Sequence, residues 1–406
     1  MGILKDRFLL ILIFIAIFTR IGLILLPAFE IDQSAFRYFS SKLANDGFEK
    51  FYSPGNFSLN ALGYLYVLWG VGLIKKNFFP EMNFFSRDYD ILLKIPATLT
   101  DIATGILIYF LIKTKLGKRW GILGFLMYVF NPAIFFNSSI WGQYDSISTF
   151  FLLLAALAII LKRNAMLMAI FFAIALTIKP QAIFFTPIAI ILTLKTTKSI
   201  NWLLTIFIFL FTTLLIYLPF FPKNPFYGLY HVNSSLANVY NCTTCFAFNF
   251  WGIFGNWQND LQTFVGIPLL VWGFILLSMS FIPIFFLKQS YLQFKPPYFY
   301  LTAAVSIMAA FIFLTRMHER YLFSFFPFLL LSTILLRSKV LIGFYIFMSG
   351  LHSLDLFLPY TYYNKLPHAY LATLLAHFRF FSFISLLCFL FLVYYFLRKM
   401  NLRQNE

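Results

Sequence analysis

The segment FSLNALGYLYVLWGVGLI (residues 57–74) is apolar enough to cross a membrane, and its placement decides the topology of the chain. If it crosses, the basic connector KTKLGKR (113–119) lies outside, against the tendency of Lys and Arg to stay on the cytoplasmic side. If it lies along the membrane surface, this connector and the later basic connectors all lie inside. We therefore predict that 57–74 is interfacial and that both termini are cytoplasmic.

The composition predicts a membrane protein with many crossings. Of the 406 residues, 61% are hydrophobic and 11% are charged, whereas a soluble domain is roughly one quarter charged. Long apolar runs recur from end to end, which predicts an all-α polytopic membrane protein of one domain (1–406) with about twelve transmembrane helices. The predicted spans are 8–26, 91–112, 120–137, 146–161, 165–178, 181–194, 199–219, 263–287, 298–314, 321–336, 340–358 and 372–397.

The formal net charge of +17 follows from this topology. Lys and Arg collect in short cytoplasmic connectors, where they attract anionic membrane lipids, and this scatter argues against nucleic acid as a partner. Of the fourteen acidic residues, only Asp6 and Glu406 fall on the cytoplasmic side. Chemistry is therefore expected on the outer or lumenal face, which carries the long loops 27–90 and 220–262.

Four polar stretches lie at the outer ends of the predicted spans. They are EID (30–32), WGQYDS (141–146), TIKPQA (177–182) and TRMHERY (315–321). Each has a plain structural explanation, such as a solvated helix end, a helix cap at Asp145 or a lysine that reaches lipid headgroups. Together they suit a reaction in which a carboxylate takes a proton from a hydroxyl while cations hold a departing phosphate.

Some polar residues leave alternatives open. Asp101 lies in the middle of a span, where a buried hydrogen bond explains it as well as a function does. Arg20 can reach the headgroups or pair with an acid of the outer rim. Cys242 and Cys245 form a CxxC that is either incidental or a local disulfide. No metal is expected, because metal-ligand spacing is lacking around His318.

The polar stretches resemble motifs of the GT-C superfamily of membrane glycosyltransferases, which take sugars from polyprenyl-phosphate carriers. IDQSAFRYF (31–39) resembles the motif after the first helix of glycosyltransferase family 57, the dolichyl-phosphate-glucose glucosyltransferases. WGQYDS resembles their His-Phe-Gln-Tyr-Asn motif, IKPQAIFFTP (178–187) resembles their Lys-Gln-Met-aromatic-Pro stretch, and RMHERY (316–321) resembles their Val-His-Glu-Lys.

Two further features bear on this resemblance. LLKIPATLTDIATGILIYFL (92–111) resembles the Leu-Pro-rich second span of these enzymes, and the WGQYD and MHERY forms are similar to prokaryotic mannosyltransferase-like relatives. Asp145 stands in place of Asn and Arg320 in place of Lys, which leaves the sugar open. A prokaryotic plasma membrane is favoured over the endoplasmic reticulum.

The resemblance implies a GT-C fold with interfacial helices in the first outer loop and an inverting hexosyltransferase without a cofactor. Mannose or glucose would pass from a polyprenyl-phosphate donor to a glycan or lipid-linked acceptor. Asp32 would be the general base, with Glu30 as a second acid. The donor phosphate would contact Lys179, Arg316, His318 and Arg320. The sugar or acceptor would contact Arg37, Trp141, Gln143, Tyr144, Asp145, Gln181 and Glu319.

Two other functions remain open on the sequence. A transporter or flippase for lipid-linked sugars also needs a polar outer cavity, and a ligase for lipid-linked sugars shares the phosphate-binding requirement. A transporter should place polar residues along both halves of its spans, whereas the cytoplasmic halves here are almost purely apolar. We therefore favour the enzyme.

Overall fold

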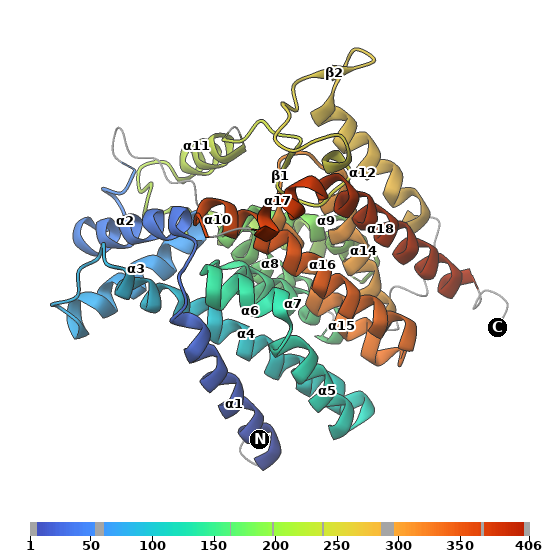
Figure 1. Cartoon of the computed structure of the whole chain (residues 1–406), viewed down its shortest axis with the longest axis horizontal. Coiled ribbons are helices and arrows are strands. Elements are labelled where there is room, and N and C mark those ends of the chain that lie inside the picture. Colours follow the sequence, from blue (N-terminus) through green and yellow to red (C-terminus); the bar gives the residue numbers. More distant parts are fainter. Residues whose placement is uncertain are drawn as a thin grey trace. The chain divides into compact units, whose positions relative to one another are not determined.

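Helices dominate the described part of the chain in the computed structural model (Figure 1). The described residues are 6–52, 61–162, 164–196, 199–237, 239–285, 296–366 and 369–401, so the start of the segment 57–74 and the end of the span 263–287 lie outside them. The chain forms two compact units. The first comprises Met1–Leu107, Ile134–Ile183 and Thr197–Val239, and the second comprises Ile108–Ala133, Phe184–Thr196 and Tyr240–Glu406.

Within the described residues, five helices are long and apolar enough to cross a membrane. They are α1 (Arg7–Ile24), α4 (Arg87–Leu116), α14 (Pro296–Phe313), α16 (Lys339–Tyr363) and α18 (Phe378–Asn401). A sixth is added if the broken segment α5 (Lys118–Val129), α6 (Pro132–Phe135) and η1 (Phe136–Trp141) counts as one span. The chain is thus a membrane-embedded, all-α protein, while the count of twelve stays a prediction because the other apolar helices are shorter.

The predicted span 120–137 is interrupted at Asn131 and Pro132. The Asn131 Oδ1 atom accepts a hydrogen bond of 2.9 Å from the backbone N–H of Ala133, as a cap does at the start of a helix. Proline fits at the first turn of a helix but not in its interior, where it lacks an N–H and its ring clashes with the preceding turn. The sequence therefore ends one helix here and starts another.

The first unit contains two tightly packed helix pairs. One pair is α2 (Glu30–Asp46) with α3 (Leu62–Phe78), joined by a hydrogen bond of 2.6 Å from the Ser40 hydroxyl to the Leu68 carbonyl. The other is α7 (Asp145–Lys162) with α8 (Ala165–Ile178), joined by a bond of 2.8 Å from the Ser148 hydroxyl to the Ala175 carbonyl. The unit also contains α10 (Ser199–Tyr217) and α11 (Pro225–Ala237).

The helices α2 and α3 lie within the predicted outer loop 27–90, as expected for that loop. Aromatic and aliphatic side chains fill the space between them. Within the described residues, α3 is not among the helices that are long and apolar enough to span a membrane. Its interfacial placement stays a prediction.

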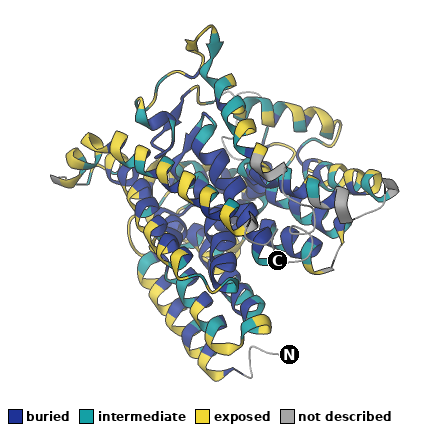
Figure 2. Ribbon diagram, turned by 90° about the vertical axis from the view of Figure 1, so that its right-hand side faces the viewer, coloured by how far each residue is buried: buried dark blue, intermediate teal, exposed yellow. Residues whose placement is uncertain are grey.

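The second unit is built around α14 and α15 (Phe325–Leu335), whose residues are almost entirely buried. Many helices of the chain carry buried residues on one face and exposed residues on the opposite face (Figure 2). The remaining helices of the unit include α12 (Leu269–Phe285) and α17 (Ala369–Ala376), and α9 (Thr186–Thr196) follows the short helix η2 (Pro180–Phe185).

Short strands lie in the predicted outer loop 220–262, at the start of the predicted span 263–287 and within TRMHERY. Strand β1 (Thr244–Cys245) pairs in parallel with β4 (Met317–His318), and Cys245 lies opposite His318. Strands β2 (Thr263–Phe264) and β3 (Ile267–Pro268) form an antiparallel hairpin. The 3-10 helices η3 (Trp251–Ile253) and η4 (Glu319–Leu322) complete this region.

The packing of α2 on α3 predicts opposite effects at two glycines of α3. A Cβ atom at Gly72 would lie 2.8 Å from the Ser40 carbonyl oxygen and 2.9 Å from the Ala44 Cβ, whereas one at Gly70 meets nothing within 4 Å. We expect Gly72→Ala to lower the melting temperature of the purified protein, because overpacking costs about 1–3 kcal/mol. Gly70→Ala should hold or raise it, because Ala favours a helix by about 1 kcal/mol. The opposite order of melting temperatures would contradict this packing.

Candidate functional site

The loop that follows η1 lies directly against the start of α2. Gly142 has a φ of +89°, and a Cβ there would collide with the Gln33 amide, so the position requires glycine. The Gln33 Nε2 atom donates to the Gly142 carbonyl at 2.9 Å, and the Phe29 N–H donates to the Trp141 carbonyl at 3.1 Å. The Phe29 and Trp141 rings stack with 4.4 Å between centroids. Two stretches that are distant in sequence are thus held at close range.

Asp32 lies at this junction and is half-buried. Its Oδ2 atom accepts a hydrogen bond of 2.8 Å from the Trp141 indole N–H and another from the Gln143 amide. Both donors are neutral. Among the described residues, no cationic side chain forms an ion pair with Asp32. Asp32 is therefore a carboxylate that is oriented but not neutralised.

A buried ion pair joins the start of α7 to the end of α8. The Lys179 ammonium nitrogen lies 2.5 Å from Asp145 Oδ1, and the two side chains are only 7% and 6% exposed. The same ammonium donates to the Gln143 side-chain oxygen at 3.5 Å and lies 4.7 Å from the Tyr144 ring centroid. Asp145 is also the first residue of α7, where the helix dipole favours a negative charge.

The Tyr144 ring also packs against α3. It stacks on Tyr64 with 3.5 Å between centroids and 9° between the ring planes. Burial, with smaller contributions from the charges of Asp32 and Tyr89, raises the pKa of Tyr64. The Tyr64 hydroxyl therefore stays neutral and contributes no charge of its own beside Asp32.

The carboxylates around Asp32 differ from it because each has a cationic partner. Arg37 forms an ion pair with Glu30, whose side chain is half exposed, and lies 3.4 Å from Asp90. Arg20 lies 3.4 Å from Asp101 and donates to the Ser139 hydroxyl at 2.9 Å. Arg20 thus pairs with an acid in the middle of a predicted span and not with one at the outer rim, and Asp101 also accepts a buried hydrogen bond from Ser138. Asp90, within the predicted outer loop, was not predicted as a site residue.

Gln181 is a predicted site residue of this unit and lies two residues after Lys179. It belongs to η2 and is partly buried. Its side-chain oxygen has no hydrogen-bond partner among the described residues. Its predicted contact with a sugar therefore gains no support from its neighbours.

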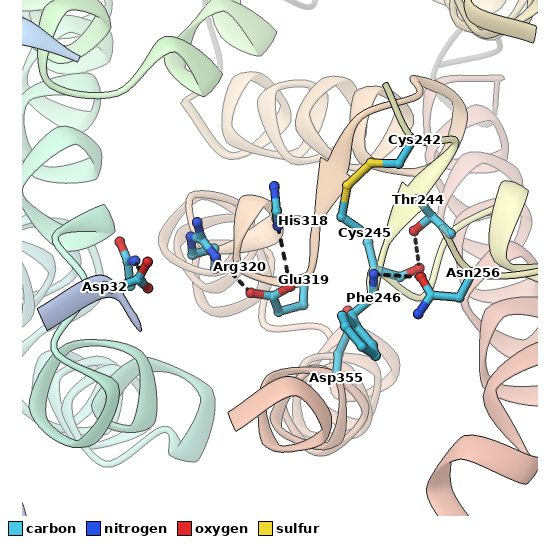
Figure 3. Close-up of polar contacts among 12 residues, drawn as sticks. Asp32, Cys242, Thr244, Cys245, Phe246, Asn256, His318, Glu319, Arg320 and Asp355 are labelled. Carbon is cyan, nitrogen blue, oxygen red and sulfur yellow. Dashed lines mark hydrogen bonds and ion pairs between the residues drawn. A yellow bond between two sulfur atoms is a disulfide. The ribbon is translucent and has the colours of Figure 1, made fainter. Parts of the chain in front are cut away.

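In the second unit, Glu319 is buried between His318 and Arg320 (Figure 3). The Arg320 guanidinium lies 2.9 Å from Glu319 Oε1, and His318 Nδ1 lies 3.9 Å from Glu319 Oε2. The pairing of β4 with β1 fixes the backbone of His318, and the disulfide Cys242–Cys245 constrains β1. The CxxC is therefore a local disulfide that restrains β1, the strand paired with the start of MHER (317–320).

Arg316, the other predicted phosphate ligand of this unit, contacts an acid that sequence reasoning missed. Its Nε atom lies 2.7 Å from Asp260 Oδ2 and its Nη2 atom 3.3 Å from Asp260 Oδ1. The Thr315 hydroxyl donates to Asp260 at 3.1 Å. Asp260 is fully buried, and it is the single acidic residue of the loop 220–262. That isolation is the sequence signal that could have identified it.

A second missed acid, Asp355, lies on α16. Its carboxylate accepts the Phe248 N–H at 3.1 and 3.2 Å and so ties the loop after β1 to this helix. His352 lies one helical turn earlier, with its Nδ1 atom 3.9 Å from the carboxylate. No group of three or more His, Cys, Asp or Glu side chains that could hold a metal ion occurs among the described residues.

The contact between Arg316 and Asp260 predicts a loss of stability that a second change restores. Arg316→Ala leaves a buried carboxylate without its cation, which typically costs about 3–5 kcal/mol. We expect a lower melting temperature for Arg316→Ala and a partial recovery in the double variant Arg316→Ala/Asp260→Asn, which removes both charges. Thermal unfolding of the purified variants measures this. If Arg316→Ala melts like the unmodified protein, the pair does not stabilise the fold.

Comparisons with known proteins assign no family to this chain. A scan against protein-family models finds no match, and a search of curated proteins finds none either. Any activity proposed for the chain therefore rests on its own residues and their geometry.

Proposed function

We propose that this protein is an inverting glycosyltransferase of the GT-C type. It transfers a hexose, mannose or glucose, from a polyprenyl-phosphate carrier to a glycan or lipid-linked acceptor at the outer or lumenal face of the membrane. The observation that carries the proposal is the environment of the Asp32 carboxylate. It is half-buried and held by two neutral donors, while Glu30, Asp90, Asp101 and Asp145 each have a cationic partner.

Asp90, Asp101 and Asp145 are buried and each contacts a cation, whereas Asp32 is partly exposed and is held by neutral donors. Asp32 therefore suits the part of general base better than its neighbours do. Both of its donors bind Oδ2, which leaves Oδ1 to receive the proton. General-base catalysis needs the carboxylate within hydrogen-bond reach of the acceptor hydroxyl, and the partial exposure of Asp32 is compatible with that contact.

The proposed reaction is a single displacement. The acceptor oxygen attacks the anomeric carbon of the sugar while its proton passes to Asp32. The bond between that carbon and the phosphate oxygen breaks, and its electrons leave with the polyprenyl phosphate. Trp141 and Gln143 hold the carboxylate in place during the transfer, and polar groups beside them suit contact with sugar hydroxyls.

The departing phosphate needs cations, and we keep Arg316, His318 and Arg320 as the candidates, because the contacts of Lys179 suit another role. Lys179, Arg316 and Arg320 each contact a carboxylate already. A guanidinium has five N–H donors, more than one carboxylate accepts, so an arginine can hold its partner and a phosphate together.

The test of the proposed base is Asp32→Asn. Asn keeps the size of the side chain but cannot accept the acceptor proton, so turnover should fall by roughly 10²- to 10⁴-fold while donor binding persists. The measurement is release of polyprenyl phosphate from synthetic polyprenyl-phosphate mannose and glucose by the purified protein in lipid bilayers, with a membrane lipid extract as acceptor.

Glu30→Gln is the matched control, because Glu30 lies two residues earlier and pairs with Arg37. It should lose less activity than Asp32→Asn. The reverse order would move the base to Glu30, and full activity in both variants would remove the base from this loop. Passage of the intact donor across the bilayer without release of its phosphate would instead identify a transporter.

A further inference from the structure

We propose that Lys179 is a positioning residue that acts on Asp32 through the side chain of Gln143, with Asp145 fixing the lysine. This inference rests on the proposed function of Asp32 and deepens it. It assigns Lys179 a role different from the phosphate contact that its sequence motif implies. The residues form one chain of contacts from a buried ion pair to the half-exposed carboxylate.

Every link of this chain is a polar contact within the first unit. Asp145 Oδ1 contacts the Lys179 ammonium at 2.5 Å, and that ammonium donates to Gln143 Oε1 at 3.5 Å. Gln143 Nε2 in turn donates to Asp32 Oδ2. Gln143 is only 2% exposed, so water has little access to its amide. The chain therefore alternates negative, positive, dipolar and negative groups.

The amide of Gln143 can take only one orientation in this series of contacts. An ammonium only donates hydrogen bonds and an ionised carboxylate only accepts them, whereas an amide has one end of each kind. The oxygen of Gln143 must therefore face Lys179, and its NH₂ group must face Asp32. Without the ammonium, none of these contacts opposes a flip that would turn the amide oxygen of Gln143 toward the Asp32 carboxylate.

The surroundings of Lys179 also limit its movement. Its ammonium lies over the Tyr144 ring, and Tyr144 is stacked on Tyr64 of α3. A lysine that is buried, paired with Asp145 and packed on an aromatic ring is suited to fix its neighbours. A ligand for an incoming phosphate would have to break or stretch these contacts.

The two roles of Lys179 predict different kinetics. A phosphate ligand contributes to donor binding, so its removal should raise the donor Kd. A positioning residue for the base contributes after the donor is bound, so its removal should lower kcat and leave the donor Kd unchanged. The pattern of coupling with Gln143 separates the roles further, because a residue that acts through Gln143 has no effect once Gln143 is gone.

The experiment compares Lys179→Met, Gln143→Met and the double variant, with polyprenyl-phosphate mannose and glucose as the donors. We expect each single variant to lose on the order of 100-fold in kcat, as misplaced catalytic groups do, with the donor Kd unchanged. The double variant should lose no more than Gln143→Met alone. Lys50→Met, which removes an exposed lysine of the same unit, should leave both constants unchanged.

Two results would overturn the inference. One is a raised donor Kd with an unchanged kcat in Lys179→Met, which would assign the lysine to the phosphate. The other is a double variant whose loss is the product of the single losses. If Lys179→Met does not fold because Asp145 is left unpaired, Lys179→Met/Asp145→Asn replaces it under the same criteria. A Lys179 effect on Kd alone, with Asp32→Asn inactive, removes this inference and leaves the proposed function standing, whereas an active Asp32→Asn removes the proposed function.

Discussion

The ion pair between Asp145 and Lys179 is the contact on which the arrangement of the candidate site depends. Two charges in an apolar, buried setting are stable only when they meet each other, because an isolated buried charge is very costly. Their contact therefore fixes the start of α7 against the end of α8. Gln143 and Tyr144 directly precede α7, and both side chains contact the Lys179 ammonium. The ion pair therefore also fixes the positions of these two side chains.

The same rule explains other polar contacts in both units. Arg20 joins α1 to Asp101 of α4, and Arg37 joins α2 to Asp90 of α4. In the second unit, Arg316, which directly precedes MHERY (317–321), pairs with Asp260. Such pairs satisfy charges that the fold encloses. Asp32 departs from the rule, because its partners are an indole and an amide, and its partial exposure is compatible with contact to a substrate hydroxyl.

Hydropathy was sufficient to predict the helical, membrane-embedded class, because long apolar runs have few other stable forms. It did not predict the break at Asn131 and Pro132, where the local chemistry of proline outweighs the apolar pattern. The predicted topology placed the stretches that contain Asp32, Trp141 and Gln143 at the outer ends of their spans. Their hydrogen bonds, however, come from the tertiary packing of η1 on α2.

The partners of the charged residues were the least predictable part of the site. Asp145 and Lys179 were both assigned to the outer rim, yet nothing in their local sequence shows that they pair across two helices. Asp260 and Asp355 lie in a loop and within an apolar helix, outside every motif that the sequence analysis identified. A pairing between distant segments depends on the three-dimensional fold, and hydrophobic periodicity carries no information about it.

The central claim is that Asp32 activates an acceptor hydroxyl for a single displacement at the sugar. The most direct measurement is the anomeric configuration of the product, determined by NMR after transfer from ¹³C-labelled polyprenyl-phosphate mannose or glucose of known configuration. One displacement inverts the anomeric centre, so the product should have the configuration opposite to that of the donor. A product with the donor's configuration would require a different mechanism and would contradict the assignment of Asp32 as the general base.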